Sequence, residues 1–194
     1  MSDRFNINPT LESQLQKSIF LVALATGGRV SEIHALQREA KYVQFTATSV
    51  ILSFPTTFLC KNEDPVQRRP PITISALVNE EGLPHRLCPV NSLKKFLAEI
   101  SASKGNLFFD KRGPCSKLSI ANHMCNLIKM SQPIPHQVRK MATSLAFLSH
   151  FTTEEVCESV GWSSIRVFYK HYLQPLQEVS HPCVILGRAL HSHC

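Results

Sequence analysis

Two basic side chains three positions apart form the first candidate site of this chain. His136 and Arg139 follow Pro135, and proline favours the first turn of a helix. Residues three apart lie on one helix face, so the imidazole and the guanidinium are expected to point at the same place. Arginine supplies a planar fork of donors, and histidine supplies another donor or a base. The pair therefore suits an anion, although a solvated basic turn is the simpler interpretation of these two residues alone.

A second arginine follows a pair of glycines near the beginning of the chain. Gly27 and Gly28 precede Arg29, and Glu32 stands three residues further on. A glycine pair lets the backbone approach a ligand closely, which suits phosphate binding. Glu32 is expected to pair with Arg29 and to fix its orientation. An ordinary turn between helices, with a surface arginine, is the alternative.

Further side chains along the chain are able to join the same chemistry. Lys61 lies between two predicted strands, where a lysine is usually only solvated. Trp162 offers one indole N–H donor and a large packing face. Two tyrosines follow it, Tyr169 and Tyr172, and because they are three apart they share a face if the segment is helical. Periodicity alone does not choose between them.

In this order the residues resemble the catalytic set of the tyrosine recombinases, the phage-integrase family, in which the fifth position is His or Trp. Longer stretches are similar to the recombinases of DIRS-type retrotransposons and Crypton elements. These stretches are Phe-Leu-Cys-Lys-Asn-Glu at 58–63, His-Gln-Val-Arg-Lys-Met-Ala-Thr-Ser at 136–144, Gly-Trp-Ser-Ser at 161–164, Phe168, and His-Tyr-Leu at 171–173. Each motif is weak by itself, whereas their shared order is specific. The resemblance covers about residues 15–175.

The resemblance implies that this chain cuts and rejoins DNA through a covalent intermediate. Tyr172, closing the His-Tyr-Leu run, is implied to attack the scissile phosphate and to form a 3′-phosphotyrosine. Arg29 and Arg139 are implied to hold the non-bridging oxygens, whose charge grows in the transition state. One phosphodiester is exchanged for another, so neither a cofactor nor an external energy source is expected.

The remaining members of the set are implied to handle protons and packing. His136 hydrogen-bonds the phosphate or takes the phenol proton, because a phenol with a pKa of about 10 is a poor nucleophile at neutral pH. Lys61 protonates the 5′-hydroxyl leaving group, and Trp162 donates its N–H but cannot relay protons. The matched motifs contain no carboxylate cluster for Mg²⁺, so no metal is expected.

The charge balance favours a polyanionic partner. The 194 residues include 21 Lys and Arg against 14 Asp and Glu, a formal net charge of +7, which fits double-stranded DNA. Five further basic residues are candidate DNA contacts: Arg68, Arg69, Lys140, Arg166 and Lys170. The sequence contains no apolar run of membrane-spanning length and no signal-peptide pattern. Seven scattered cysteines indicate reduced thiols in an intracellular protein.

Hydrophobic spacing predicts an α+β domain that is mainly α-helical with a small antiparallel β-sheet. This is also the architecture that the resemblance implies, the catalytic domain shared by tyrosine recombinases and type IB topoisomerases. Helices are expected at 11–26, 32–36, 89–101, 118–130 and after Pro135, and strands at 42–45, 49–54 and 72–74.

Finer expectations concern caps and buried faces. Ser31 is expected to cap the helix at 32–36, and Thr153 the segment that ends at Gly161. The helix after Pro135 is expected to bury Val138, Ala142, Leu145, Ala146 and Leu148.

Residues 1–175 are expected to form the catalytic domain. A full recombinase carries an N-terminal core-binding domain as well, and residues 1–10 are too short to supply it. Residues 176–194 are expected to be a C-terminal tail, which in this family often docks on a neighbouring protomer. The expected partners are therefore double-stranded DNA and further copies of the chain, in a synaptic tetramer with the tail in trans. A nuclear location is expected if the host is eukaryotic.

Site-specific recombination for mobile-element integration is the function that these features favour. A domesticated, non-cleaving DNA-binding domain of the same fold is one alternative, which the presence of every catalytic position disfavours. A type IB topoisomerase-like nicking-closing enzyme is the other, and the local match to His-Gln-Val-Arg and Gly-Trp-Ser-Ser favours a recombinase over it.

Overall fold

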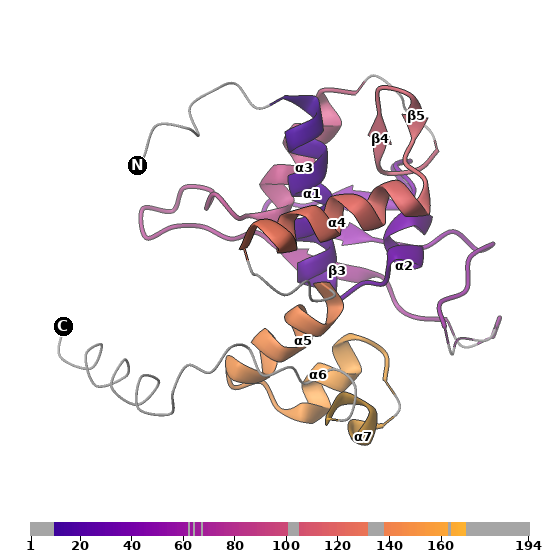
Figure 1. Ribbon diagram of the computed structural model, residues 1–194, viewed down its shortest axis with the longest axis vertical. Coiled ribbons are helices and arrows are strands. Elements are labelled where there is room, and N and C mark those ends of the chain that lie inside the picture. Colours follow the sequence, from indigo (N-terminus) through magenta and orange to yellow (C-terminus); the bar gives the residue numbers. More distant parts are fainter. Residues whose placement is uncertain are drawn as a thin grey trace.

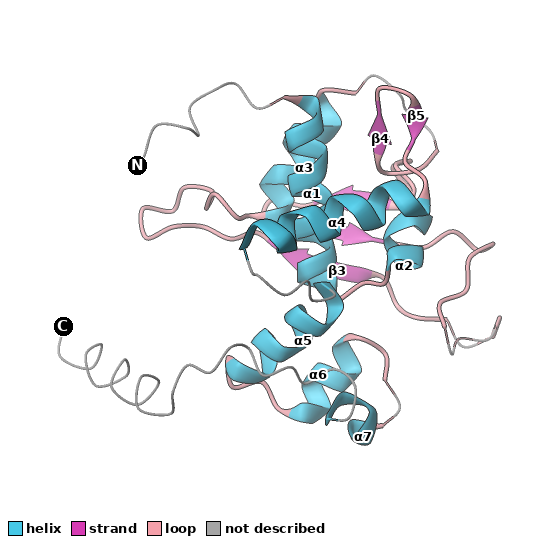
Figure 2. Ribbon diagram, viewed as in Figure 1, coloured by secondary structure: helices cyan, strands magenta, loops and turns pink. Residues whose placement is uncertain are grey.

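The computed structural model describes residues 10–169, apart from positions 62, 64, 67, 101–104, 132–137 and 163. The expected α+β class is confirmed, because helices predominate and the strands form small antiparallel sheets (Figures 1 and 2). The elements run in the order α1 (Leu11–Thr26), α2 (Val30–Ala35), β1 (Val43–Phe45), β2 (Ser49–Leu52), β3 (Ile72–Ser75), α3 (Pro89–Ala98), β4 (Phe109–Asp110), β5 (Gly113–Pro114), α4 (Lys117–Ser131), α5 (Val138–Leu148), α6 (Thr153–Ser159) and α7 (Ile165–Val167).

Helix α1 is the centre of the larger hydrophobic core. Its N-cap residue, Thr10, accepts a hydrogen bond from the backbone of Ser13, which satisfies one of the free N–H groups of the first turn. Ile19, Val22 and Ala23 are fully buried, because α3, α4 and α5 pack around the helix (Figure 1). The predicted helix 11–26 is therefore confirmed at both ends, and it directs the chain toward Arg29.

The three-stranded sheet has the order β1-β2-β3, with both pairs antiparallel. Val50 pairs with Ile74, and Leu52 pairs with Val43 and Ile72. Alternate residues of β2 are buried, as expected for a sheet with one face on a core. The connection from β2 to β3, residues 53–71, carries Lys61 away from this core.

A second, smaller hydrophobic cluster holds the end of the described chain together. Val156, Cys157, Val160, Trp162 and Phe168 form it, on α6, α7 and the turn between them. Figure 1 shows these elements below the sheet, joined to the main core through α5. No helix in the described part of the chain is long and apolar enough to cross a membrane.

Two cap predictions are wrong by one or two positions. Ser31 lies inside α2, because the helix begins at Val30 and the Glu32 carboxylate accepts from the backbone N–H of Arg29 at 2.9 Å. Thr152, and not Thr153, caps α6, in a reciprocal arrangement with Glu155. In both helices a glutamate in the first turn binds the N-cap amide and sets the start.

The predicted buried face of α5 is only partly correct. Val138 is buried, but Leu145 is 42% exposed. The inward positions are taken instead by Arg139, Thr143 and Ser144, and the Thr143 hydroxyl donates to the Arg139 carbonyl at 3.0 Å. Helix α5 thus directs hydrogen-bonded polar side chains into the interior, in place of part of the predicted apolar stripe. The side chain of Leu148 lies outside the described residues.

Candidate active site

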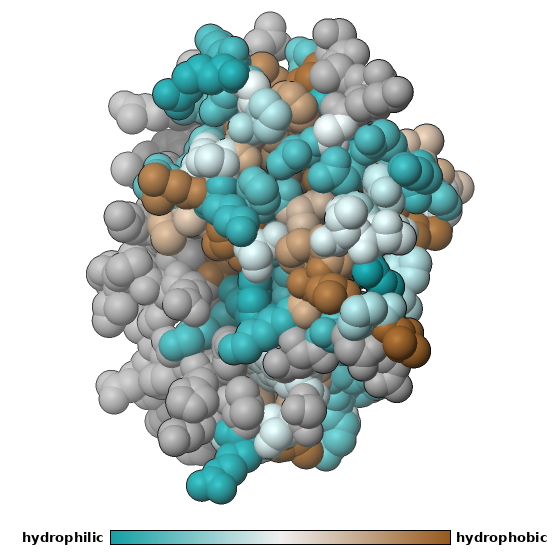
Figure 3. All heavy atoms as spheres, turned by 90° about the vertical axis from the view of Figure 1, so that its right-hand side faces the viewer, coloured by the Kyte–Doolittle hydropathy of each residue, from teal (hydrophilic) through white to brown (hydrophobic). Residues whose placement is uncertain are grey.

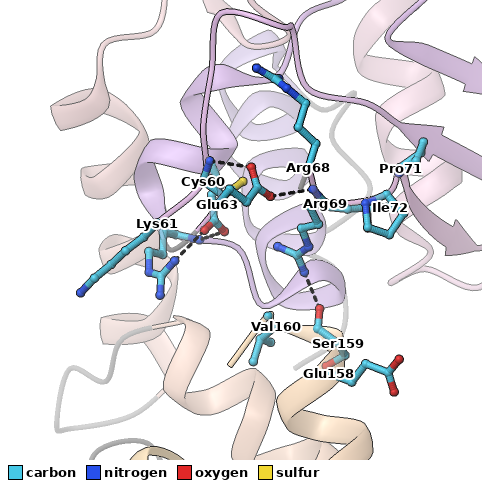
Figure 4. Close-up of a pocket in the computed structure, with 14 residues that line it drawn as sticks. Cys60, Lys61, Glu63, Arg68, Arg69, Pro71, Ile72, Glu158, Ser159 and Val160 are labelled. Carbon is cyan, nitrogen blue, oxygen red and sulfur yellow. Dashed lines mark hydrogen bonds and ion pairs between the residues drawn. The ribbon is translucent and has the colours of Figure 1, made fainter. Parts of the chain in front are cut away.

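A cavity of about 480 Å³ lies between the β2–β3 connection and the turn after α6. Its walls carry four basic and three acidic residues (Figure 4). These are Arg29, Lys61, Arg68, Arg69, Glu32, Glu63 and Glu158. The side of the molecule that Figure 3 shows is largely hydrophilic among its described residues, and its apolar side chains are scattered. The cavity wall is therefore polar, and its seven charged side chains carry one net positive charge.

Gly27 brings the Arg29 segment against the turn after α6. Its φ of 57° is left-handed, a conformation that favours glycine. A Cβ at Gly27 would also lie 2.6 Å from Cγ1 of Val160. Backbone geometry and close packing thus both require a glycine here, and the next residues place Arg29 in the cavity wall.

Glu32 holds the guanidinium of Arg29. Nη1 of Arg29 donates to one carboxylate oxygen at 2.9 Å, and the backbone N–H of Arg29 donates to the other at 2.9 Å. The Arg29 side chain remains 25% exposed, whereas that of Glu32 is 3% exposed. The pairing expected from the sequence is present, and part of the Arg29 side chain remains exposed in the cavity wall.

Arg139 lies behind this wall of the cavity and is almost completely buried. Its Nη1 lies 3.4 Å from a Glu32 oxygen, and its Nη2 donates to the Val160 carbonyl at 2.6 Å. Its guanidinium carbon lies 5.3 Å from the centre of the Trp162 ring, within the range of a cation–π contact. One carboxylate therefore serves two arginines, and the three side chains together carry one net positive charge.

Trp162 packs within the smaller hydrophobic cluster. The residue is 9% exposed, and its ring centre lies 6.0 Å from that of Phe168. Its backbone N–H donates to the Cys157 carbonyl at 2.8 Å. Its contact with the Arg139 guanidinium connects this cluster to the arginine pair.

Lys61 lies in a turn at the edge of the cavity. The backbone N–H of Glu63 donates to the Cys60 carbonyl at 3.1 Å, Cys60 is buried, and Lys61 is exposed.

Burial raises the pKa of the Cys60 thiol to about 12, and the charges of Glu32 and Glu63 add to the rise. The thiol is therefore protonated at neutral pH and unsuited to act as a nucleophile.

Of the five candidate DNA contacts, four are described. Arg68 is exposed, and its guanidinium donates to the carbonyls of Thr56 and Phe58 within the same connection. Lys140 is partly buried on α5, and Arg166 is exposed on α7.

Arg69 is tied to the opposite side of the cavity. Its guanidinium donates to the Ser159 carbonyl, at the end of α6 (Figure 4). Arg69 therefore connects the two sides of the cavity, whereas the sequence predicted it only as a DNA contact.

His136, Lys170 and Tyr172 lie outside the described residues. The structure thus brings together Arg29, Glu32, Lys61, Arg139 and Trp162 out of the predicted set. Among the described residues, no group of three or more His, Cys, Asp and Glu side chains is arranged to hold a metal ion.

Sequence reasoning did not assign a role to Glu63 or to the backbone carbonyls of Ser159 and Val160. A glutamate three residues after Cys60 fits a carboxylate-capped turn, but this signal is common in loops. The carbonyls have no sequence signal, because any residue supplies one.

No family model and no curated protein matches the sequence. Solved structures with the same fold include the XerA recombinase, with a TM-score of 0.55 at 12% identity over 95% of this chain and 62% of that chain. A lambda integrase dimer bound to a COC′ core site has a TM-score of 0.50 at 13% identity, over 89% of this chain and 55% of that chain. The Tn1549 transposon integrase in complex with transposon right-end DNA has a TM-score of 0.51 at 16% identity, over 96% and 65%.

These likenesses show the fold. The chain has the architecture of a tyrosine recombinase catalytic domain, and it spans between 55% and 65% of the length of the three proteins.

Proposed function

We propose that this chain is a DNA strand transferase that cleaves and rejoins DNA through a 3′-phosphotyrosine. The main supporting observation is that the Glu32 carboxylate binds both Arg29, three positions before it, and Arg139, 107 positions after it. This cluster lies beside a cavity that Lys61 borders. The fold shared with integrases supports the same function.

The arginine pair supplies fixed positive charge for a phosphate. Arg29 presents its exposed part to the cavity, and Arg139 adds a nearly buried charge behind it. Donors held in place before the reaction stabilise the charge that develops on the non-bridging oxygens without reorganisation. In this proposal Tyr172 forms the bond to phosphorus, and His136 hydrogen-bonds the phosphate or accepts the phenol proton.

The finer parts of the proposal come from the sequence motifs. We infer a recombinase of the DIRS or Crypton type, which acts in mobile-element integration and, in a eukaryotic host, in the nucleus. Residues 1–175 form its catalytic domain. Residues 176–194 dock on a neighbouring protomer in a synaptic tetramer on double-stranded DNA. Arg68, Lys140, Arg166 and Lys170 are its proposed contacts with the DNA backbone, which set position and not sequence.

The test is covalent capture on a suicide substrate. A pool of duplexes has one fixed scissile phosphate, a nick shortly after it and randomised flanking bases. The strand before the scissile phosphate carries a 5′ label. Cleavage releases a short 5′-hydroxyl fragment that diffuses away, so the labelled strand stays attached to the protein. We expect a labelled adduct on a denaturing gel, formed equally well in excess EDTA.

The outcomes separate the function classes. A non-cleaving DNA-binding domain shifts the duplex in a native gel but gives no adduct. A type IB topoisomerase-like enzyme gives an adduct and also relaxes supercoiled plasmid as a monomer. Loss of the adduct in EDTA, with recovery in Mg²⁺, would contradict the proposal and indicate a metal-dependent nuclease.

A further inference from the structure

Glu63 fastens both ends of the loop that carries Lys61. One carboxylate oxygen accepts from the backbone N–H of Cys60 at 2.9 Å, and the other accepts from the backbone N–H of Arg69 at 3.1 Å (Figure 4). The Glu63 backbone closes the turn by donating to the Cys60 carbonyl. Lys61 is thus enclosed in a turn whose first and last residues bind each other twice.

The same loop is anchored to the rest of the cavity at two places. The Cys60 side chain is buried, since the residue is 6% exposed, so the residue before Lys61 is fixed on the interior. Arg69 donates to the Ser159 carbonyl across the cavity. The next residue, Val160, accepts from Arg139. The lysine loop and the buried arginine are therefore attached to adjacent peptide groups.

We propose that Glu63 is a positioning residue for Lys61, holding the turn so that the ammonium is delivered to the leaving group, with Arg69 as the second anchor of the loop. The proposal rests on the proposed function. Figure 4 shows the Lys61 side chain extending away from the turn, on the side opposite to Arg69. A long, exposed side chain has many rotamers, and only the backbone from which it starts is under the control of the fold.

The chemical step that Glu63 would assist is the protonation of the departing oxygen. As the Tyr172 oxygen bonds to phosphorus, the bond from phosphorus to the 5′ oxygen breaks. The phenol proton leaves to a base, and the Lys61 ammonium gives its proton to the 5′ oxygen. A 5′-bridging sulfur leaves as a thiolate without needing this proton, because a thiol is far more acidic than an alcohol.

The experiment compares Glu63→Gln with the wild type on suicide duplexes that carry either oxygen or sulfur at the 5′-bridging position. Glutamine keeps the size of the side chain but turns an NH₂ group toward one of the two backbone N–H donors. We expect adduct formation on the oxygen substrate to slow roughly 10- to 100-fold, the range for loss of an orienting partner. On the sulfur substrate the variant should regain most of the wild-type rate.

Three further variants complete the design. Glu81→Gln makes the same change at an exposed loop glutamate and should behave as the wild type on both substrates. Glu63→Asp keeps the charge but is one methylene too short to reach both amides, and should show the same dependence on the leaving group. Lys61→Ala removes the proposed proton donor, so its rate on the oxygen substrate shows how much adduct formation slows when the donor is missing.

Two results would overturn the inference in different ways. Suppose that the wild type forms adducts, but Glu63→Gln and Glu63→Asp are either equally slow on both substrates or as fast as the wild type on both. Glu63 then does not act through Lys61. If the wild type forms no adduct on oxygen or sulfur substrate, the proposed function fails, and the inference fails with it. Thermal unfolding of each variant shows whether a loss common to both substrates reflects unfolding.

Discussion

Arg139 lies 107 positions from Glu32 in the sequence, yet its guanidinium Nη1 is 3.4 Å from a Glu32 carboxylate oxygen. The same oxygen accepts from the backbone N–H of Arg29, and the other oxygen accepts from the Arg29 side chain. A single carboxylate thus caps α2, orients one arginine and balances a second that is 5% exposed. A charge buried this deeply is tolerated only when it is paired.

Replacing Glu32 with glutamine should therefore destabilise the fold. The amide keeps the shape of the side chain but leaves Arg139 without its anionic partner in the interior. Removing one member of a buried ion pair typically costs about 3–5 kcal/mol, and we expect the free energy of unfolding to fall by about 3 kcal/mol. Urea unfolding followed by circular dichroism measures this change.

Glu81→Gln is the matched control for that measurement, because it removes the same charge from an exposed loop position. Its unfolding midpoint should stay close to that of the wild type. Equal stability of Glu32→Gln and Glu81→Gln would mean that the carboxylate is not needed to keep Arg139 inside the fold.

Exchanging either arginine for lysine should separate catalysis from stability. Lysine keeps the charge but loses the planar fork, so strand cleavage should drop by roughly 100-fold or more, with only slightly weaker DNA binding. Arg139→Lys should also lower the unfolding midpoint, since it loses the contacts with the Val160 carbonyl and with Trp162. Arg29→Lys, at a partly exposed position, should not.

Suicide-substrate kinetics and urea unfolding test these two variants in parallel. Near-normal cleavage by Arg139→Lys would contradict the proposed role of Arg139 at the phosphate. Unchanged stability in Arg139→Lys would contradict the burial argument instead, so the two claims fail independently.

Local patterns in the sequence predicted most of the fold. The helix at 11–26 has an apolar stripe, an N-cap threonine and a terminal glycine, and all three act locally. The strands predicted at 42–45, 49–54 and 72–74 are present as β1 (Val43–Phe45), β2 (Ser49–Leu52) and β3 (Ile72–Ser75). The error on α5 arose because tertiary contacts override the local pattern, so Arg139 takes an inward position and Leu145 remains 42% exposed.

The site was predictable in its residue types but not in its arrangement. The spacing of Arg29 and Glu32 predicts their pairing, because both lie in one helical turn. The sharing of Glu32 with Arg139 depends on how α2 and α5 pack, which no short motif encodes. Similarly, Glu63 was part of a matched stretch. Its hydrogen bonds with the backbone N–H groups of Cys60 and Arg69 form only because the loop brings Arg69 back beside Glu63.

Two buried thiols should make the protein less stable in alkaline solution. The pKa of Cys60 is raised to about 12 and that of Cys115 to about 11, in both cases chiefly by burial, from an ordinary 9.0. Above pH 9 the unfolded chain loses these protons while the folded chain keeps them, so deprotonation favours unfolding. Their contribution to stability is complete below pH 9 and is lost as the pH rises toward 11–12.

Urea unfolding at pH 8 and pH 10 should show this effect as a difference between variants. Cys60→Ala should lose less stability between the two values than the wild type does, by roughly 1 kcal/mol. Cys125→Ala, at an exposed thiol, should follow the wild type. An identical pH dependence for all three proteins would show that Cys60 titrates normally in the folded state.

The choice of nucleophile is the last prediction, and it concerns Tyr169 and Tyr172. The Tyr169 ring packs at 5.4 Å from the Phe168 ring and 6.3 Å from the Phe147 ring, measured between centroids, and the residue is 51% exposed. Its ring thus already has a packing role beside the smaller cluster. Tyr172 closes the His-Tyr-Leu run that matches the recombinase motif, so we predict that it is the nucleophile.

Phenylalanine substitutions distinguish the two because each removes only a hydroxyl group. Tyr172→Phe should bind DNA and unfold as the wild type does, yet give no covalent adduct on the suicide duplex. Tyr169→Phe keeps its ring contacts and should still give one, and peptide mapping of that adduct should find the DNA on Tyr172. An adduct from Tyr172→Phe that is absent from Tyr169→Phe would show that the motif has been aligned in the wrong register.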